Sequence, residues 1–182
     1  MVYKYIHDKY PNDVSPTIED HYLCSVNING KEYEQKIFMS SEDEYETMLW
    51  GWISTGDKFI LVFALDNYAS FTSLKSLYEK ITKNGKNKYP FVLVGNKCEI
   101  PENERKVSKN EAEELAKNWG MDYFEVSPEA DTNGNINLVF ENISKKIIEF
   151  RGKKKPKSKQ KSEKCYIKNI VQAIGIIKNF EK

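Results

Sequence analysis

The 182-residue chain is poor in cysteine and lacks a long apolar run. Its three cysteines, Cys24, Cys98 and Cys165, have neither metal-binding nor redox spacing, which argues against a disulfide framework and favours a reducing compartment. Met1 leads directly into polar sequence, and no stretch reaches the roughly 20 apolar residues of a membrane-spanning helix. A cytoplasmic protein is therefore expected.

A glycine-rich phosphate loop of the form G-x-x-x-x-G-K-[ST] is also absent from these 182 residues. Such loops hold nucleotide phosphates with backbone N–H groups, a lysine and a helix N-terminus. The chain does contain Asn96-Lys97 directly after the apolar run 89–95, with Glu99 where a guanine-binding loop carries Asp. In such a loop the Asn orients the backbone, the Lys stem covers the base, and the carboxylate accepts two guanine N–H groups. The sequence thus predicts a base-binding loop without a phosphate-binding loop.

The charges divide the chain into two parts. Residues 1–150 hold 17 Lys and Arg against 25 Asp and Glu, a net charge of −8, whereas residues 151–182 hold 11 against 2, a net charge of +9. Because 40% of the residues are hydrophobic and 13% aromatic, we expect residues 1–150 to form one folded domain and residues 151–182 a basic tail.

The tail itself has two sections. Residues 151–164 are rich in Lys with Pro and Ser interleaved, which is typical of a solvated segment. Residues 166–180 place isoleucines at helical spacing, which predicts an amphipathic helical segment. A basic segment followed by such a helix suits an anionic membrane surface, here the cytoplasmic face of the plasma membrane; a solvated tail is the alternative.

The pattern of the first 150 residues predicts an α/β fold with three layers. Asn29-Gly30 is a strong hairpin signal, and the later segments alternate between strand and helix patterns. The predicted strands are 22–28, 32–38, 58–65, 89–95 and 122–126, and the predicted helices are 43–53, 70–83, 108–119 and 137–150. This order gives a mostly parallel sheet with one antiparallel edge strand, and ligands bind at its carboxyl ends, where Asn96 and Ser127 stand. The last helix is expected to face the sheet with Leu138, Ile143, Ile147 and Ile148.

The chain up to about Arg151 resembles the Ras family of small GTPases. Residues 15–22 resemble the effector segment of that family, and residues 55–59, 91–98 and 125–127 follow in family order at family-like intervals. The resemblance implies a Ras-like fold of the P-loop NTPase type, GTP or GDP with Mg²⁺ as cofactor, and effector or regulator proteins as partners. No nucleic-acid partner is expected.

The resemblance also assigns roles to individual residues. The guanine-binding positions are Asn96, Lys97, Glu99 and Ser127, with Tyr10 over the base. Thr17 matches the Mg²⁺ ligand of the family. The effector region comprises Val14, Ser15, Pro16, Thr17, Ile18, Glu19, Asp20, His21 and Tyr22.

Three departures from the family pattern bear on activity. Met1 falls inside the family's first helix, so the first strand and the phosphate loop are missing. Residues 39–42 lack the Asp, Gly and Gln with which the family binds Mg²⁺, senses the γ-phosphate and positions water. In the base loop, Pro128 removes an N–H group and Glu129 replaces a cation with an anion. No catalytic residue is identified, and we expect a pseudo-GTPase that acts as an effector-binding interaction module, with impaired or absent GTP binding and hydrolysis.

Two alternatives stay open. One is a GTP-hydrolysing switch whose phosphate loop lies upstream of an incorrectly assigned start, and the other is a gene remnant without function. The missing strand is the centre of the family's sheet, and each backbone group left buried and unpaired beside it costs about 1–3 kcal/mol. The strands that end at Phe38 and Leu65 are therefore expected to pair directly in parallel, or to hold a strand from a second molecule.

Overall fold

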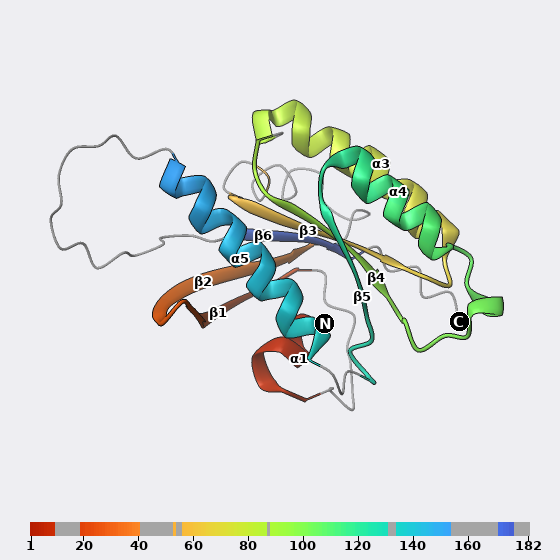
Figure 1. The fold of residues 1–182 in the computed structure, drawn as a ribbon, viewed down its shortest axis with the longest axis horizontal. Coiled ribbons are helices and arrows are strands. Elements are labelled where there is room, and N and C mark those ends of the chain that lie inside the picture. Colours follow the sequence, from red (N-terminus) through yellow and green to blue (C-terminus); the bar gives the residue numbers. More distant parts are fainter. Residues whose placement is uncertain are drawn as a thin grey trace, which may run out of the picture.

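A six-stranded sheet forms the middle layer of the protein in the computed structural model (Figure 1). The structure describes residues 1–9, 19–40, 53, 56–86, 88–130, 134–153 and 171–176, with only the backbone at 19–21, 39–40, 84, 86, 152–153 and 171–176. The strands are β1 (Glu19–Ile28), β2 (Lys31–Ser40), β3 (Lys58–Ala64), β4 (Phe91–Asn96), β5 (Asp122–Val126) and β6 (Val171–Ile176). Their order across the sheet is β1-β2-β6-β3-β4-β5. Among the described strands, only β1 and β2 pair antiparallel, which confirms the predicted parallel sheet with an antiparallel edge.

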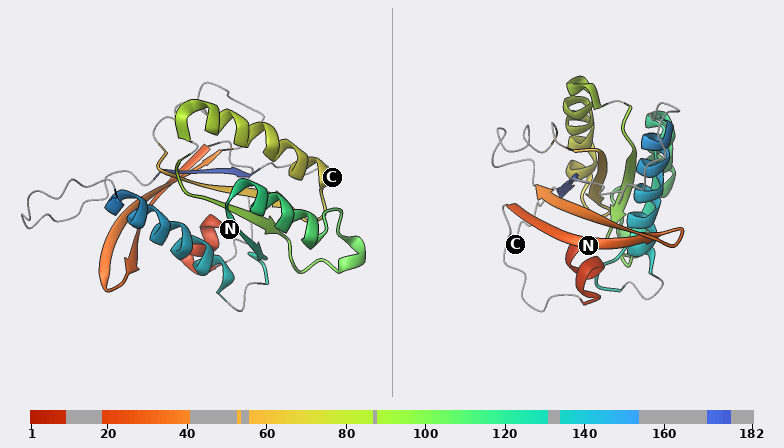
Figure 2. Two further views of the ribbon diagram at one scale, coloured as in Figure 1. Left: turned by 45° about the horizontal axis from the view of Figure 1, so that its top comes forward. Right: turned by 90° about the vertical axis from the view of Figure 1, so that its left-hand side faces the viewer.

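Helices cover both faces of this sheet. The helices are α1 (Val2–His7), α3 (Tyr68–Ile81), α4 (Lys109–Trp119) and α5 (Asn135–Lys153), with a π-helical turn at Thr82–Lys86 and a 3-10 turn at Glu102–Glu104. Side chains of α3 and α4 share one core, and those of α1 and α5 share the core of the other face. The left view of Figure 2 shows α3 above the sheet and α5 below it.

Strand β3 is buried on both faces, as its continuous apolar run predicts. Phe59, Leu61 and Phe63 pack in the core with α3 and α4. Ile60 and Val62 belong to the core with α5. Parallel pairing from Phe59↔Phe91 to Ala64↔Asn96 places the carboxyl end of β3 beside that of β4.

Local signals set the turns and helix ends where the sequence predicts them. Asn29 and Gly30 have φ values of 53° and 75°, the left-handed pair that a tight hairpin requires. Ser108 caps α4, because its side chain accepts a hydrogen bond from Glu111 N at 3.2 Å. Gly120, at φ 67°, ends that helix.

The predicted closure of the sheet was wrong. Strands β2 and β3 neither pair with each other nor hold a strand from a second molecule, because β6 of the same chain lies between them. Residues 171–176 are therefore a strand and not part of the predicted amphipathic helix. Isoleucines spaced for a helix also suit a short strand, and backbone partners on both sides favour the strand, whereas an isolated short helix is marginal in water.

In helix α5 one of the four residues predicted to face the sheet, Leu138, is exposed instead. Ile143 and Ile147 are buried against the sheet as expected and Ile148 is half-buried, but Leu138 is 51% exposed. The buried stripe follows a helical spacing of three and four residues, and Leu138 lies off it. The inward residues that the prediction omitted are Ile136, Val139 and Phe140.

Candidate functional site

The predicted base loop lies at the carboxyl end of β4, between the ends of β3 and β5. Its backbone is bonded to both neighbours: Leu65 N donates to Asn96 O at 3.0 Å, and Cys98 N donates to Val126 O at 3.2 Å. Lys97 has a φ of 68°, a left-handed conformation that turns the chain out of the strand. Asn96 pairs in register with Val126, so the structure brings Asn96, Lys97 and Ser127 to one edge of the sheet.

Two polar oxygen atoms at this edge are buried without a partner among the described residues. They are Oδ1 of Asn96 and Oδ1 of Asp66, the latter two residues after β3. The other carboxylate oxygen of Asp66, Oδ2, accepts a hydrogen bond from Lys97 Nζ at 2.6 Å, and both side chains of that ion pair are 33% exposed. Buried acceptors without donors are costly. This edge therefore suits a ligand that supplies N–H groups, as a guanine base does.

Asp66 was not among the residues predicted for this site. The sequence could have identified it, because Asp66 directly follows the predicted strand that ends at Leu65. Residues that follow parallel strands meet at the carboxyl edge of the sheet. The ion pair holds the Lys97 ammonium against β3. The Lys97 ammonium, at the end of the stem that was expected to cover a base, is thus paired with Asp66 in this structure.

Arg105 binds the backbone of the base loop, and it was also not predicted from the sequence. Its guanidinium donates to the carbonyl oxygen of Cys98 at 2.9 Å and to that of Ile100 at 3.2 Å. It also forms an ion pair with Glu125 at 3.0 Å, and Glu125 accepts from the Tyr123 hydroxyl at 2.9 Å. Burial and the neighbouring Glu125 carboxylate raise the pKa of Tyr123. This network fixes the loop that carries Glu99.

Glu99 and Ser127 differ in their surroundings. Glu99 is exposed, which leaves its carboxylate in water. Ser127 is buried, and its Oγ accepts a hydrogen bond from Ala130 N at 3.0 Å, which closes the turn over Pro128 and Glu129. The structure thus places Ser127 inside this edge of the sheet and the Glu99 carboxylate at the surface.

Other predicted positions are described only in part. Tyr10 and residues 14–18, which include the predicted Mg²⁺ ligand Thr17, lie outside the described residues. Residues 19–21 are described as backbone in β1, the edge strand of the sheet. Tyr22 is half-buried and packs on the core with α5. Among the described residues, no group of three or more His, Cys, Asp or Glu side chains could hold a metal ion.

A second polar cluster is buried between the sheet and α5, at the amino end of β3. Lys58 is fully buried, and its Nζ donates to Gln35 Oε1 at 3.0 Å and to Ser144 Oγ at 2.8 Å. Gln35 Nε2 in turn donates to the Tyr5 hydroxyl at 2.8 Å. Burial lowers the pKa of Lys58 to about 7. The cluster lies at the opposite end of β3 from the base loop, so we assign it to the packing of the domain.

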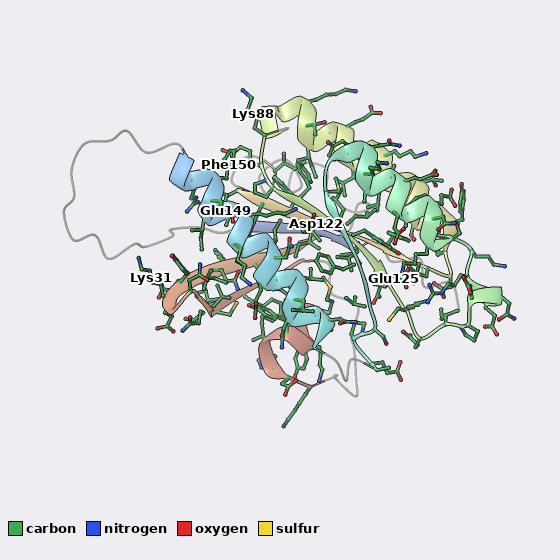
Figure 3. The ribbon with its side chains drawn as sticks, in the orientation of Figure 1. Lys31, Lys88, Asp122, Glu125, Glu149 and Phe150 are labelled. Carbon is green, nitrogen blue, oxygen red and sulfur yellow. The ribbon has the colours of Figure 1, made fainter. Side chains whose placement is uncertain are left out.

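An aromatic cavity of about 320 Å³ opens at the same amino-terminal edge. Tyr78 and Trp119 stack in its wall with ring centroids 4.2 Å apart. The ring centroids of Tyr89 and Phe150, the latter on α5, are 5.2 Å apart. Figure 3 shows Phe150 far from Glu125, which lies at the base-loop end of the sheet. The cavity is therefore separate from the predicted nucleotide site.

No helix among the described residues is long and apolar enough to cross a membrane. This finding concerns the helices α1, α3, α4 and α5 alone.

Comparison with known proteins identifies the family. The sequence model of the Ras family matches residues 1–149. The Ras-related protein Ral-B of Mus musculus is 30% identical over 165 residues, which cover 89% of this chain and 77% of Ral-B. The three-layer fold and the position of Asn96-Lys97 at a carboxyl edge agree with this match. The chain belongs to the Ras family of small GTPases.

Proposed function

We propose that this Ras-family signalling protein is a pseudo-GTPase: an effector-binding interaction module with impaired or absent GTP binding and hydrolysis. It acts in the cytoplasm, and its partners are effector or regulator proteins. The observation that carries the proposal is the strand in the middle of the sheet. The position that leads to the phosphate loop in the family is held by β6, and the chain continues from it as Ile177-Lys178-Asn179, without a glycine-rich loop.

The residues present fit only one end of a guanine nucleotide. Asn96 Oδ1 and Asp66 Oδ1 are buried acceptors that a base could satisfy. The phosphate end has no counterpart in the 182 residues, because they contain no G-x-x-x-x-G-K-[ST] segment. Family members hold Mg²⁺ beside the γ-phosphate, and without a site for that phosphate we derive no hydrolytic step.

Nucleotide titration tests this proposal. Guanosine, GDP and GTP are titrated into the protein with and without Mg²⁺. We expect weak binding that does not tighten with the number of phosphates. A sub-micromolar Kd for GDP or GTP that requires Mg²⁺ would overturn the proposal and favour the alternative, a GTP-hydrolysing switch.

Glu99→Asp is the matched variant. Asp has the side-chain length that the family uses to accept two guanine N–H groups, and one such hydrogen-bond arrangement is worth about 1–3 kcal/mol, or roughly 10- to 100-fold in affinity. We expect the variant to tighten guanosine and GTP by the same factor. A larger gain for GTP than for guanosine would show that the chain holds phosphates after all.

The effector surface of the proposal is the exposed edge of β1. Among the described strands β1 pairs only with β2, so it is an edge strand to which a partner can add a strand. Leu23 on this strand is 75% exposed, an apolar contact that a soluble partner can cover. Leu23→Lys is expected to abolish binding to effector domains of Ras-family proteins, whereas Ser76→Lys on the exposed side of α3 is not. Equal loss in both variants would argue against this surface.

A further inference from the structure

Strand β6 has parallel neighbours on both sides, and both are more than 100 residues away in the sequence. It pairs with β2 from Lys36↔Val171 to Ser40↔Gly175, and with β3 from Lys58↔Gln172 to Val62↔Ile176. Both of its edges are therefore hydrogen-bonded. Figure 1 shows it between β2 and β3, in the middle of the sheet.

Without β6 the sheet would be two separate pieces. The hairpin β1–β2 and the parallel unit β3-β4-β5 have no direct pairing in the strand order. Two strands that flank a third lie about 9–10 Å apart, twice the usual spacing, which is too far for a hydrogen bond. The backbone groups on the facing edges of β2 and β3 would lose their partners, and each one left buried and unpaired is costly.

The same chain can reach this slot. Helix α5 ends beside the starts of β3 and β4, because Arg151 forms an ion pair with Asp57 and the Phe150 ring lies 5.2 Å from Tyr89. Strand β6 begins at the same end, where Gln172 is in register with Lys58. Parallel strands need a crossover of this kind, and α5 supplies it. The 17 residues from 154 to 170 exceed the few residues that such a return normally takes.

We propose that the gap between β2 and β3 is a binding groove for an extended strand, and that residues 171–176 of the same molecule are its occupant. In this arrangement the C-terminal strand takes the central place that the first strand holds in the family. The role of residues 171–176 is thus to complete the domain, and they are not available to lie on a membrane as a helix. This inference goes beyond the proposed function and does not depend on whether a nucleotide binds.

Hydrogen exchange on the full 182-residue chain gives the first test. We expect the amides of residues 171–176 to exchange at least about 10³-fold more slowly than in a free peptide of the same sequence, because a central strand opens only with the domain. Exchange at the rate of the free peptide would overturn the proposal.

Proline substitution gives the second test. Ala173→Pro with Gly175→Pro removes two N–H groups from the centre of the sheet, a position that proline does not tolerate. We expect loss of the cooperative urea transition or a large fall in its midpoint. Ser158→Pro with Ser162→Pro, in the tail before β6, is the matched control and should leave the midpoint unchanged. Equal midpoints for the wild type and the β6 variant would contradict the proposal.

The third test separates one molecule from two, and it needs no variant. Nuclear Overhauser effects between backbone protons of β6 and those of β2 and β3 are measured in a sample that mixes isotope-labelled and unlabelled protein. Effects within one molecule, in a protein that sediments as a monomer, support the proposal. Effects between molecules would replace it with a strand-exchanged dimer.

Discussion

Replacement of the buried Lys58 by methionine should remove a pH dependence from the stability of the domain. Lys58 is fully buried, and its hydrogen-bond partners among the described residues, Gln35 and Ser144, are neutral. Burial lowers its pKa from 10.5 to about 7. In the unfolded chain the pKa returns to about 10.4, so between these values the unfolded state holds more protons at this site than the folded state.

The sign of the effect follows from that difference. Stability rises with pH wherever the unfolded state binds more protons, so the wild type should become more stable from pH 7 upward. Below pH 7 both states carry the charge, and the full cost of the buried ammonium is present. From pH 7 to pH 9 the gain is about 2 kcal/mol, at up to 1.4 kcal/mol per pH unit. With a urea slope of about 2 kcal/mol/M, the unfolding midpoint should rise by about 1 M.

Other groups limit the useful range. Burial raises the pKa of Cys24 and raises that of Tyr5 to about 12. Both groups keep their proton longer in the folded state, so they lower stability as the pH rises above about 9. The amino group of Met1, with a pKa lowered by burial to about 6, adds a gain between about pH 6 and 8. The Met1 and Tyr5 contributions are common to the wild type and to Lys58→Met. The Lys58 charge itself lowers the pKa of Cys24, so the difference between the two proteins isolates Lys58 below about pH 8, where the thiol keeps its proton in both states.

Urea unfolding from pH 7 to 9 is the assay, with Lys75→Met as the control. Lys75 is exposed on α3, so its substitution removes the same charge without changing a buried group. The whole rise in midpoint should persist in Lys75→Met, whereas Lys58→Met should keep only the part that the Met1 amino group adds below about pH 8. A wild-type midpoint that is flat from pH 7 to 9, or an equal rise in both variants, would refute the reasoning.

Three further predictions concern other parts of the chain. Gly95→Ala places a Cβ 2.7 Å from the Tyr123 hydroxyl and 3.2 Å from a Leu65 side-chain carbon. We expect the free energy of unfolding in urea to fall by about 1–3 kcal/mol, and an unchanged value would mean that the neighbouring side chains move aside without cost. Ser108→Ala removes the cap of α4 and should cost about 1 kcal/mol in the same assay, while an unchanged midpoint would show that water replaces the cap. Residues 151–164, with a net charge of +7, should bind phosphatidylserine vesicles in a salt-sensitive way. If a reporter fused to residues 151–182 stays in solution at low salt, the membrane-surface prediction is wrong.

The features that the sequence predicts well depend on neighbours in the chain. The Asn29-Gly30 turn, the Ser108 cap and the Gly120 stop each act within about four residues, so their signals are complete in a short window. The continuous apolar run of β3 predicts a strand covered on both faces for the same reason. The place of Asn96 at a carboxyl edge then follows from the parallel order of the strands.

The features that the sequence does not predict depend on distant partners. Residues 171–176 form a strand because they pair with backbone groups of β2 and β3, which are more than 100 residues away. The spacing of their isoleucines suits a helix as well as a strand, so it does not decide between the two. Lys58 begins an apolar run, and nothing near it in sequence shows that Gln35 and Ser144 will enclose it. The pairing of Lys97 with Asp66 likewise joins two strand ends 31 residues apart.

The middle of the sheet connects the two proposals, because the space between β2 and β3 holds one strand. A segment that supplied the family's first strand and its phosphate loop would need the same edges of β2 and β3 that β6 uses. Phosphate binding of the family type and docking of residues 171–176 therefore exclude each other in one molecule. Over a strand from a second molecule, residues 171–176 have the advantage of a tether, which gives them a high effective concentration at the groove. Under the two proposals taken together, the domain keeps the edge of β1 as an effector surface, while its own tail fills the position from which a nucleotide would control that surface.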